Sequence, residues 1–307
     1  MTQFRILMIG APVDSGKTRP GCLMGPDAFR SARLQGALED LGHEVRDLGN
    51  VVPDAVDIAP RDGLHALPET IGWTQSLSRT AKAAMADGLP IFLGGDHSLS
   101  LGTVHGVAAH AAEIGKPLFV LWLDAHSDFH TPRTTQSGNL HGTPMAYLTG
   151  RDGFDGFPPV PHPVPEANVC LLGLRSVDGP EQEMLSQTAI RRHDMREIDE
   201  YGIATPIRAF LADVAAAGGM LHVSLDVDFL DPAVAPAVGT TVPGGATVRE
   251  AHLVMEMLHD SGLMCSMDLV ELNPMLDERG RSAQVMVDLA ASALGRRVFD
   301  RPTPRLL

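Results

Sequence analysis

The first candidate metal ligands in the sequence are two carboxylates and an imidazole that alternate along the chain. Asp124, His126 and Asp128 directly follow the apolar run 118–123, which predicts a buried strand. Residues two apart in an extended backbone point to the same side, so these side chains converge where that strand ends. Open α/β sheets place their binding sites at this end. Alone, such a cluster could still be a solvated turn.

A second acidic pair repeats this arrangement and strengthens the case for a metal centre. Asp226 and Asp228 follow the apolar run 221–225, and His97 follows a glycine pair that permits a tight turn. Burial of four carboxylates and two imidazoles together is unfavourable without cations and favourable with two divalent ions. Mixed oxygen and nitrogen ligation suits Mn²⁺, and the lack of thiolate ligands disfavours structural zinc. Asp96 is expected to orient these groups rather than bind metal.

Hydrolysis is the natural reaction for such a centre, because two metal ions can activate a water and polarise a substrate. The turn-rich loop 131–142 supplies hydroxyls, an amide and His141, a candidate general acid. Glu271 ends a strand-like run at the same edge and could pair with a cationic group. Asp178 and Glu181 follow another strand and could receive an ammonium.

Strands and helices alternate along the chain and would carry these residues. Strand-like runs lie at residues 5–9, 44–46, 90–93, 118–123, 168–172, 189–192, 221–225 and 264–270. Helix-like segments lie at residues 26–38, 74–86, 99–114, 203–217, 247–259 and 283–294. The alternation predicts a mainly parallel sheet that helices cover on both faces. Thr247 and Glu250 predict a capping box at the start of one helix.

Composition indicates a soluble, globular chain. It has 307 residues, 44% of them hydrophobic, and a net charge of -14, which argues against a nucleic-acid-binding surface. The cysteines Cys22, Cys170 and Cys265 are widely spaced, so we expect reduced thiols. No signal-peptide region or membrane-length apolar run is evident, which predicts a cytoplasmic protein with no membrane contact. We expect one domain over residues 1–307, with the Pro-rich stretch 153–165 as a surface loop.

The segment from Gly10 to Thr18 looks like a phosphate-binding loop and is rejected as one. Five residues separate Gly10 from Gly16, where the motif requires four. Pro12 removes an amide donor, and the residues after Lys17 are not helix-like, so no helix N-terminus would receive a phosphate.

Together these motifs resemble the signature set of the ureohydrolases, and within it the chain is similar to arginases. The motifs are Gly-Gly-Asp-His97-Ser, Asp124-Ala-His126-Ser-Asp128, Ser137-Gly-Asn-Leu-His141-Gly, Ser224-Leu-Asp226-Val-Asp228-Phe-Leu-Asp-Pro and Glu271-Leu-Asn-Pro. The resemblance implies a three-layer α/β/α fold with a mainly parallel sheet of about eight strands. It implies two Mn²⁺ ions per subunit, hydrolysis of L-arginine to L-ornithine and urea, and a homo-oligomer, either a trimer or a hexamer. The tail 300–307 gives no interface signal.

The resemblance also implies a role for each metal ligand and catalytic group. One manganese ion would be bound by His97, Asp124, Asp128 and Asp226, and the other by His126, Asp124, Asp226 and Asp228. Asp128 would also orient the hydroxide that bridges the ions. His141 would carry protons and protonate the leaving amine, and Glu271 would hold the guanidinium.

Substrate contacts complete what the resemblance implies. They are expected at His130, Thr135, Ser137, Asn139, Asp178, Glu181 and Thr240. Ser137 and Asn139 would help bind the α-carboxylate, and Asp178 and Glu181 the α-amino group. His130 departs from the family pattern, because arginases commonly have Asn there, although an imidazole could still donate to a carboxylate. The order Gly179-Pro180 before Glu181 is also unusual.

Three other functions remain as alternatives. A related ureohydrolase acting on agmatine or a guanidino acid is the nearest, but agmatine lacks an α-carboxylate and would not need Ser137 and Asn139. A non-catalytic metal protein would not need His141 or Glu271. A nucleotide-binding protein would bind ATP or GTP even after metal chelation.

Overall fold

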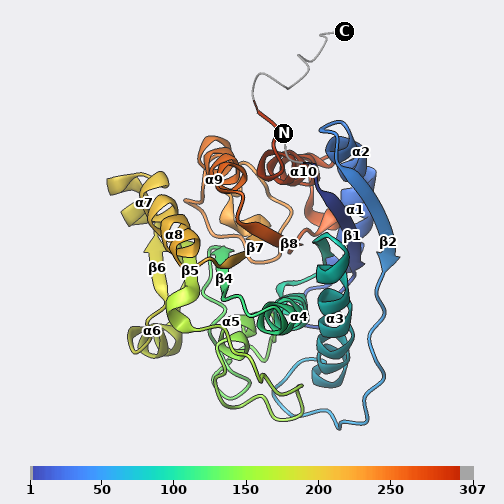
Figure 1. Ribbon diagram of the computed structural model, residues 1–307. Helices are drawn as coiled ribbons and strands as arrows, with labels where there is room; N and C mark the ends of the chain where they lie inside the picture. Colours follow the sequence, from blue (N-terminus) through green and yellow to red (C-terminus); the bar gives the residue numbers. More distant parts are fainter. Residues whose placement is uncertain (1–2, 298–307) are drawn as a thin grey trace.

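The computed structural model describes residues 3–297 and contains one sheet of eight parallel strands (Figure 1). The strands are β1 (Arg5–Ala11), β2 (Glu44–Asn50), β3 (Leu89–Gly94), β4 (Leu118–Leu123), β5 (Val169–Leu174), β6 (Arg191–Asp194), β7 (Met220–Asp226) and β8 (Met264–Val270). Their order is β2-β1-β3-β8-β7-β4-β5-β6, and every neighbouring pair is parallel. Each strand-like run of the sequence overlaps one of them, so the predicted sheet is confirmed.

Helices cover both faces of this sheet and give three layers. One face packs against α1 (Gly25–Ser31), α2 (Leu34–Glu39), α7 (Met195–Tyr201), α8 (Ala204–Ala216), α9 (Val248–Ser261) and α10 (Arg281–Ala293). The other packs against α3 (Leu67–Asp87), α4 (Ser100–Glu113), α5 (Pro144–Leu148) and α6 (Gly179–Ser186). Figure 1 shows α3 and α4 on one side of the strands and α9 and α10 on the other. Alternate residues of β1 enter the two cores, with Ile6 and Met8 in one and Leu7 and Ile9 in the other.

Two predicted helices differ from those in the structure. The segment 26–38 is not one helix, because Arg33 adopts a left-handed φ of 65° between α1 and α2. The break lets both short helices bury apolar side chains in the same core. Helix α3 begins at Leu67 rather than near residue 74. It includes Gly72, where a Cβ would lie 2.2 Å from the Asp54 carbonyl oxygen, so glycine permits a close backbone approach that helix propensity does not reveal.

The sequence did not reveal the short helices, whereas the expected capping box and the loop at residues 153–165 are confirmed. Sequence periodicity did not identify α5, α6, α7 or the short 3₁₀ helices η1 (Cys22–Met24), η2 (His97–Leu99), η3 (Glu166–Asn168), η4 (Val227–Phe229) and η5 (Pro274–Leu276). The capping box of Thr247 and Glu250 is present, and residues 153–165 form no helix or strand. Within residues 3–297, no helix is both long and apolar enough to cross a membrane. The tail 300–307 lies outside the described residues.

The four central strands position the predicted site. Strands β3, β8, β7 and β4 are neighbours and run in the same direction. Their carboxyl ends lead to His97, Glu271, Asp226 and Asp124, respectively. Residues far apart in the sequence therefore meet at one edge of the sheet, as expected for an open α/β fold.

Candidate metal centre

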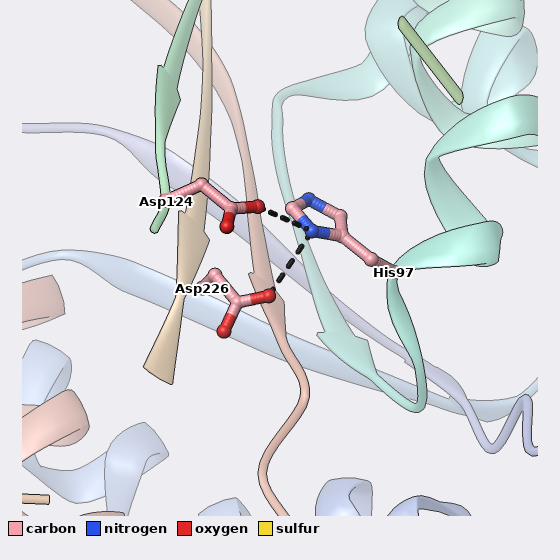
Figure 2. Close-up of side chains that lie close together, drawn as sticks. All are labelled: His97, Asp124 and Asp226. Carbon is pink, nitrogen blue, oxygen red and sulfur yellow. Dashed lines mark ion pairs between the residues drawn. The ribbon is translucent and has the colours of Figure 1, made fainter. Parts of the chain in front are cut away.

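The imidazole of His97 lies among three carboxylates. Its Nδ1 is 3.0 Å from Asp124 Oδ2, 3.1 Å from Asp128 Oδ2 and 3.1 Å from Asp226 Oδ2. All four side chains are buried. Figure 2 shows His97, Asp124 and Asp226 pointing towards one another. These four donor atoms form the first ligand set.

A second ligand set lies next to the first and shares Asp124 with it. His126 Nδ1 is 3.4 Å from Asp124 Oδ1 and 3.1 Å from Asp228 Oδ2. Asp124 therefore offers one oxygen to each set, as a carboxylate that bridges two ions would. Asp226 differs, because it lies with His97 and Asp124 but not in the second set, which consists of Asp124, His126 and Asp228. A second bridge through Asp226 stays a prediction.

Backbone hydrogen bonds order the two ligand turns. Asp124 Oδ1 accepts the N–H of His126 at 2.7 Å, and Asp228 Oδ1 accepts the N–H of Ala125 at 3.0 Å. Asp128 has a left-handed φ of 49°, a conformation that aspartate tolerates better than most residues. The turn after β4 is thus tied to the turn after β7, and the ligand positions depend on both.

Buried polar atoms without partners indicate that this site fits cations. His97 Nδ1, Asp124 Oδ2 and Asp128 Oδ2 have no hydrogen-bond partner within residues 3–297. They face one another at 3.0–3.1 Å but form no hydrogen bond, and buried polar atoms without a hydrogen bond are rare in folded proteins. Since all three belong to the first ligand set, a metal ion would satisfy them together. The oxygen and nitrogen donors suit borderline divalent ions.

The pKa values of the cluster in the metal-free protein indicate an excess of buried negative charge. Burial and repulsion by Asp124 raise the pKa of Asp128 well above its ordinary value and also raise the pKa of Asp228. Burial lowers the pKa of His126, but the carboxylates of Asp228 and Asp124 outweigh this effect and raise it to about 12. The cluster thus favours bound positive charge, which protons supply in the protein alone and divalent ions would supply in a metal complex.

Two neighbours that sequence reasoning missed fix the His97 ring. Ser224 Oγ lies 2.8 Å from His97 Nε2, and the Trp122 ring stacks on the imidazole at 4.1 Å with parallel planes. In a metal complex Ser224 would accept the Nε2 proton, and the Nδ1 lone pair would then be the one that faces the ion. Ser224 lies two residues before Asp226 in β7 and so shares its face, which is the signal that could have revealed it.

Asp96 acts on the backbone that carries His97 rather than on its ring. Its Oδ1 accepts the N–H of Ser98 at 3.0 Å and caps η2, which begins at His97. Its Oδ2 accepts the N–H of Gly16 at 2.8 Å. Asp96 therefore joins the turn after β3 to the segment after β1.

The two ligand sets open into a cavity of about 200 Å³. Its lining includes all six predicted metal ligands, together with His130, Thr135, Ser137, Asn139, His141, Asp178, Glu181 and Thr240. Glu271 is the one predicted site residue that the lining does not include. The structure thus brings the proposed metal, catalytic and substrate contacts to one place.

Residues at the outer side of the cavity are themselves ordered by hydrogen bonds. His130 Nε2 lies 2.9 Å from Asp178 Oδ2, so the imidazole contacts a carboxylate as its chemistry allows. Glu181 Oε1 accepts the hydroxyl of Ser127 at 2.6 Å and the N–H of Phe129 at 3.1 Å, which supports the ligand turn. Asp178 and Glu181 form a capping box on α6, and proline in the first helical turn explains the unusual sequence order.

Glu271 is buried behind the cavity and has an ionic partner that the sequence did not reveal. Its side chain is 1% exposed and forms a salt bridge with Lys17, which is 2% exposed. Its Oε1 accepts the N–H of His97 at 2.9 Å and contacts His141 Nδ1 at 3.0 Å. The backbone of Glu271 has a φ of 65°, which lies in the left-handed region. Sequence reasoning considered Lys17 only within the rejected phosphate-binding motif.

Three layers, ligands at the strand ends and one carboxylate shared by two ligand sets define the class of this protein. It is a three-layer α/β/α protein with a cluster suited to two metal ions. The chain belongs to the arginase family, which matches residues 4–295. Hydrolysis of L-arginine to L-ornithine and urea is the activity of this family.

Known relatives agree over nearly the whole chain. The arginase of Brucella melitensis biotype 1 is 60% identical over 299 residues, which cover 96% of this chain and 98% of that protein. The arginase of Bacillus subtilis is 38% identical, with 96% and 99% covered. The solved structure of arginase from Bacillus caldovelox has a TM-score of 0.89 at 36% identity and covers 96% of this chain and 100% of that one.

Proposed function

We propose that two Mn²⁺ ions bind at this cluster and support hydrolysis of L-arginine by this chain. The observation that carries the proposal is the position of Asp124, whose two oxygens lie in two different ligand sets. When bound, such ions lower the pKa of water and polarise a substrate. Mixed carboxylate and imidazole ligation is the chemical reason for choosing manganese.

The metal ligands divide into two groups in this proposal. His97, Asp124, Asp128 and Asp226 would hold the first ion, and His126, Asp124 and Asp228 would hold the second, with Asp226 as a further ligand. Asp128 would also accept a hydrogen bond from the attacking water and so orient it. Thr240 donates its hydroxyl to Asp228 Oδ2 at 3.2 Å and steadies that ligand from the cavity side.

His141 is the proposed proton carrier. It lines the cavity, and its Nδ1 is held by Glu271, so Nε2 is the ring atom that remains for the substrate. Nε2 would donate its proton to the amine that leaves as the side chain of L-ornithine. The attacking water would give its oxygen to the guanidinium carbon and would return a proton to the ring as the C–N bond to the leaving amine breaks, so one water is consumed for each urea formed.

The outer side of the cavity is proposed to bind the amino-acid end of L-arginine. Ser137, Asn139 and Thr135 offer donors to the α-carboxylate, and His130 lies near them. Asp178 and Glu181 offer carboxylates to the α-amino group, directly or through water. Since agmatine has no α-carboxylate, these donors favour L-arginine as the substrate.

A urea-release panel tests this proposal. The purified protein is assayed with L-arginine, agmatine and guanidinobutyrate, each with Mn²⁺, with Co²⁺ and without metal. We expect the highest kcat/KM for L-arginine with Mn²⁺ and little urea without metal. Preference for agmatine would reject the assignment of L-arginine as the substrate. Absence of urea with every substrate would reject the proposed hydrolase activity.

We also propose a cytoplasmic homo-oligomer, a trimer or hexamer, whose subunits each form one catalytic domain. One sheet carries every ligand, which supports the single domain. All three cysteines are free, which is compatible with a reducing compartment. Light scattering would give the oligomeric state, and cell fractionation would give the location.

A further inference from the structure

We infer that Lys17 is a positioning residue for this hydrolysis, because its ammonium is the resident counter-ion of Glu271 and fixes that carboxylate as the anchor of His141. The inference rests on the proposed function, since it concerns the group that carries the proton. It gives a role to the lysine of the motif that resembles a phosphate-binding loop.

Both oxygens of Glu271 are occupied within the protein. Oε2 accepts from the Lys17 ammonium, and Oε1 accepts the N–H of His97 at 2.9 Å and contacts His141 Nδ1 at 3.0 Å. Lys17 Nζ also donates to Cys22 Sγ at 2.9 Å. The carboxylate is buried and does not line the cavity, and a substrate guanidinium that binds Oε2 would have to displace Lys17.

The charges of the pair are mutually dependent. Lys17 is 2% exposed and Glu271 is 1% exposed, so water solvates neither charge, and the ammonium and the carboxylate contact each other directly. Removal of one partner would leave an uncompensated buried charge, so each residue requires the other.

The backbone next to Lys17 fixes the main chain of His141, whereas Glu271 contacts its ring. The carbonyl of Gly16 accepts the N–H of Leu140 at 2.6 Å and the N–H of His141 at 3.0 Å. A Cβ at Gly16 would lie 2.5 Å from Asp96 Oδ1, so only glycine fits this close approach. Residues 16–17 therefore fix the backbone of His141 directly and its ring through Glu271.

This arrangement has a consequence for substrate binding. Direct binding of the guanidinium by Glu271, which the family resemblance implies, would make Lys17 a competitor of the substrate. As the counter-ion that keeps Glu271 on His141, Lys17 instead supports turnover. The two arrangements predict opposite effects of a neutral residue at position 17.

The test compares Lys17→Met with the wild type in the Mn²⁺-loaded enzyme. We expect kcat for L-arginine to fall at least ~100-fold, the usual contribution of a positioned general acid, while KM changes less than ~3-fold. Lys82→Met is the matched control, because Lys82 pairs with Glu113 on the surface, and it should leave both constants unchanged. A lower KM with preserved kcat, or an unchanged kcat, would overturn the inference.

Two further measurements keep the test decisive if Lys17→Met folds poorly or if the wild type releases no urea. The double variant Lys17→Met/Glu271→Gln removes both charges and should match Glu271→Gln in kcat within ~3-fold, since Lys17 acts only through that carboxylate. A further loss of ~100-fold in the double variant would contradict this.

A crystal structure of Lys17→Met, or of the double variant against Glu271→Gln, needs no turnover. Loss of the contact between His141 Nδ1 and residue 271 on removal of Lys17 supports the inference, and retention of it overturns the inference. An inactive wild type would reject the proposed function instead, so the two failures are distinguishable.

Discussion

Replacement of Ser224 by alanine isolates how the fold orients one metal ligand. The Ser224 hydroxyl lies 2.8 Å from His97 Nε2, and both side chains are fully buried. Ser224→Ala removes one oxygen atom and leaves the ring stacked on Trp122. The imidazole then loses the group that directs its Nδ1 lone pair towards the carboxylates.

The expected size of this effect follows from the burial of the bond. Loss of a hydrogen-bond partner of a ligand imidazole typically weakens metal binding ~10–100-fold. At about 1.4 kcal/mol for each factor of ten, this is roughly 1.4–2.8 kcal/mol. An unsatisfied buried donor costs about 1–3 kcal/mol, so the metal-free protein should lose unfolding free energy of that order.

Ser266→Ala provides the matched control for this experiment. Ser266 Oγ lies 2.8 Å from the Nδ1 of His222, a buried histidine outside the ligand sets, and the two residues are register partners on β8 and β7. We expect both variants to lose similar unfolding free energy in urea. Calorimetric titration with Mn²⁺ should show weaker binding only for Ser224→Ala. Equal Mn²⁺ affinity of the two variants would refute the reasoning.

Three other predictions follow from the buried groups. Mn²⁺ at about 100 times its Kd should raise the unfolding free energy of the metal-free protein by about 2.7 kcal/mol, and an unchanged melting temperature in calorimetry would contradict this. The pKa of Glu271 lies well below 4.5, so its stabilising contribution is present above pH 4.5 and is lost as the pH falls through the lower folded value. Glu271→Gln should therefore flatten the acid decline in urea-unfolding measurements, and an unaltered decline would exclude this source. Burial raises the pKa of Cys22, of Cys170 to about 12 and of Cys265 to about 11, so iodoacetamide at about pH 8 should label none rapidly in the native protein, whereas fast labelling would show access to a thiolate.

The sheet and the metal ligands were predictable because their signals are local. The six inner strands are short, largely apolar runs, whereas the outer strands β2 and β6 are polar. Asp124, His126 and Asp128 alternate immediately after one of the apolar runs. Parallel strands then bring such turns to one edge of the sheet, whatever their distance along the chain. The break at Arg33 was not predictable in this way, since it depends on how two short helices fit one core.

The groups that position the metal ligands and the proton carrier could not be predicted, because tertiary contacts bring them into place. Ser224 reaches His97 only because β7 and β3 both flank β8. Lys17 and Glu271 are 254 positions apart, and neither sequence context indicates the other. Lys17 instead stands in a segment that resembles a phosphate-binding loop but has the wrong glycine spacing for one.

The most direct test of the central claim is urea release from L-arginine as Mn²⁺ is added in measured amounts to the metal-free protein. Two ligand sets that share Asp124 predict little urea at first, full activity at about two ions per chain, and equal amounts of urea and L-ornithine. Full activity in the chelated protein, or saturation at one ion per chain, would contradict a centre in which two ions act together.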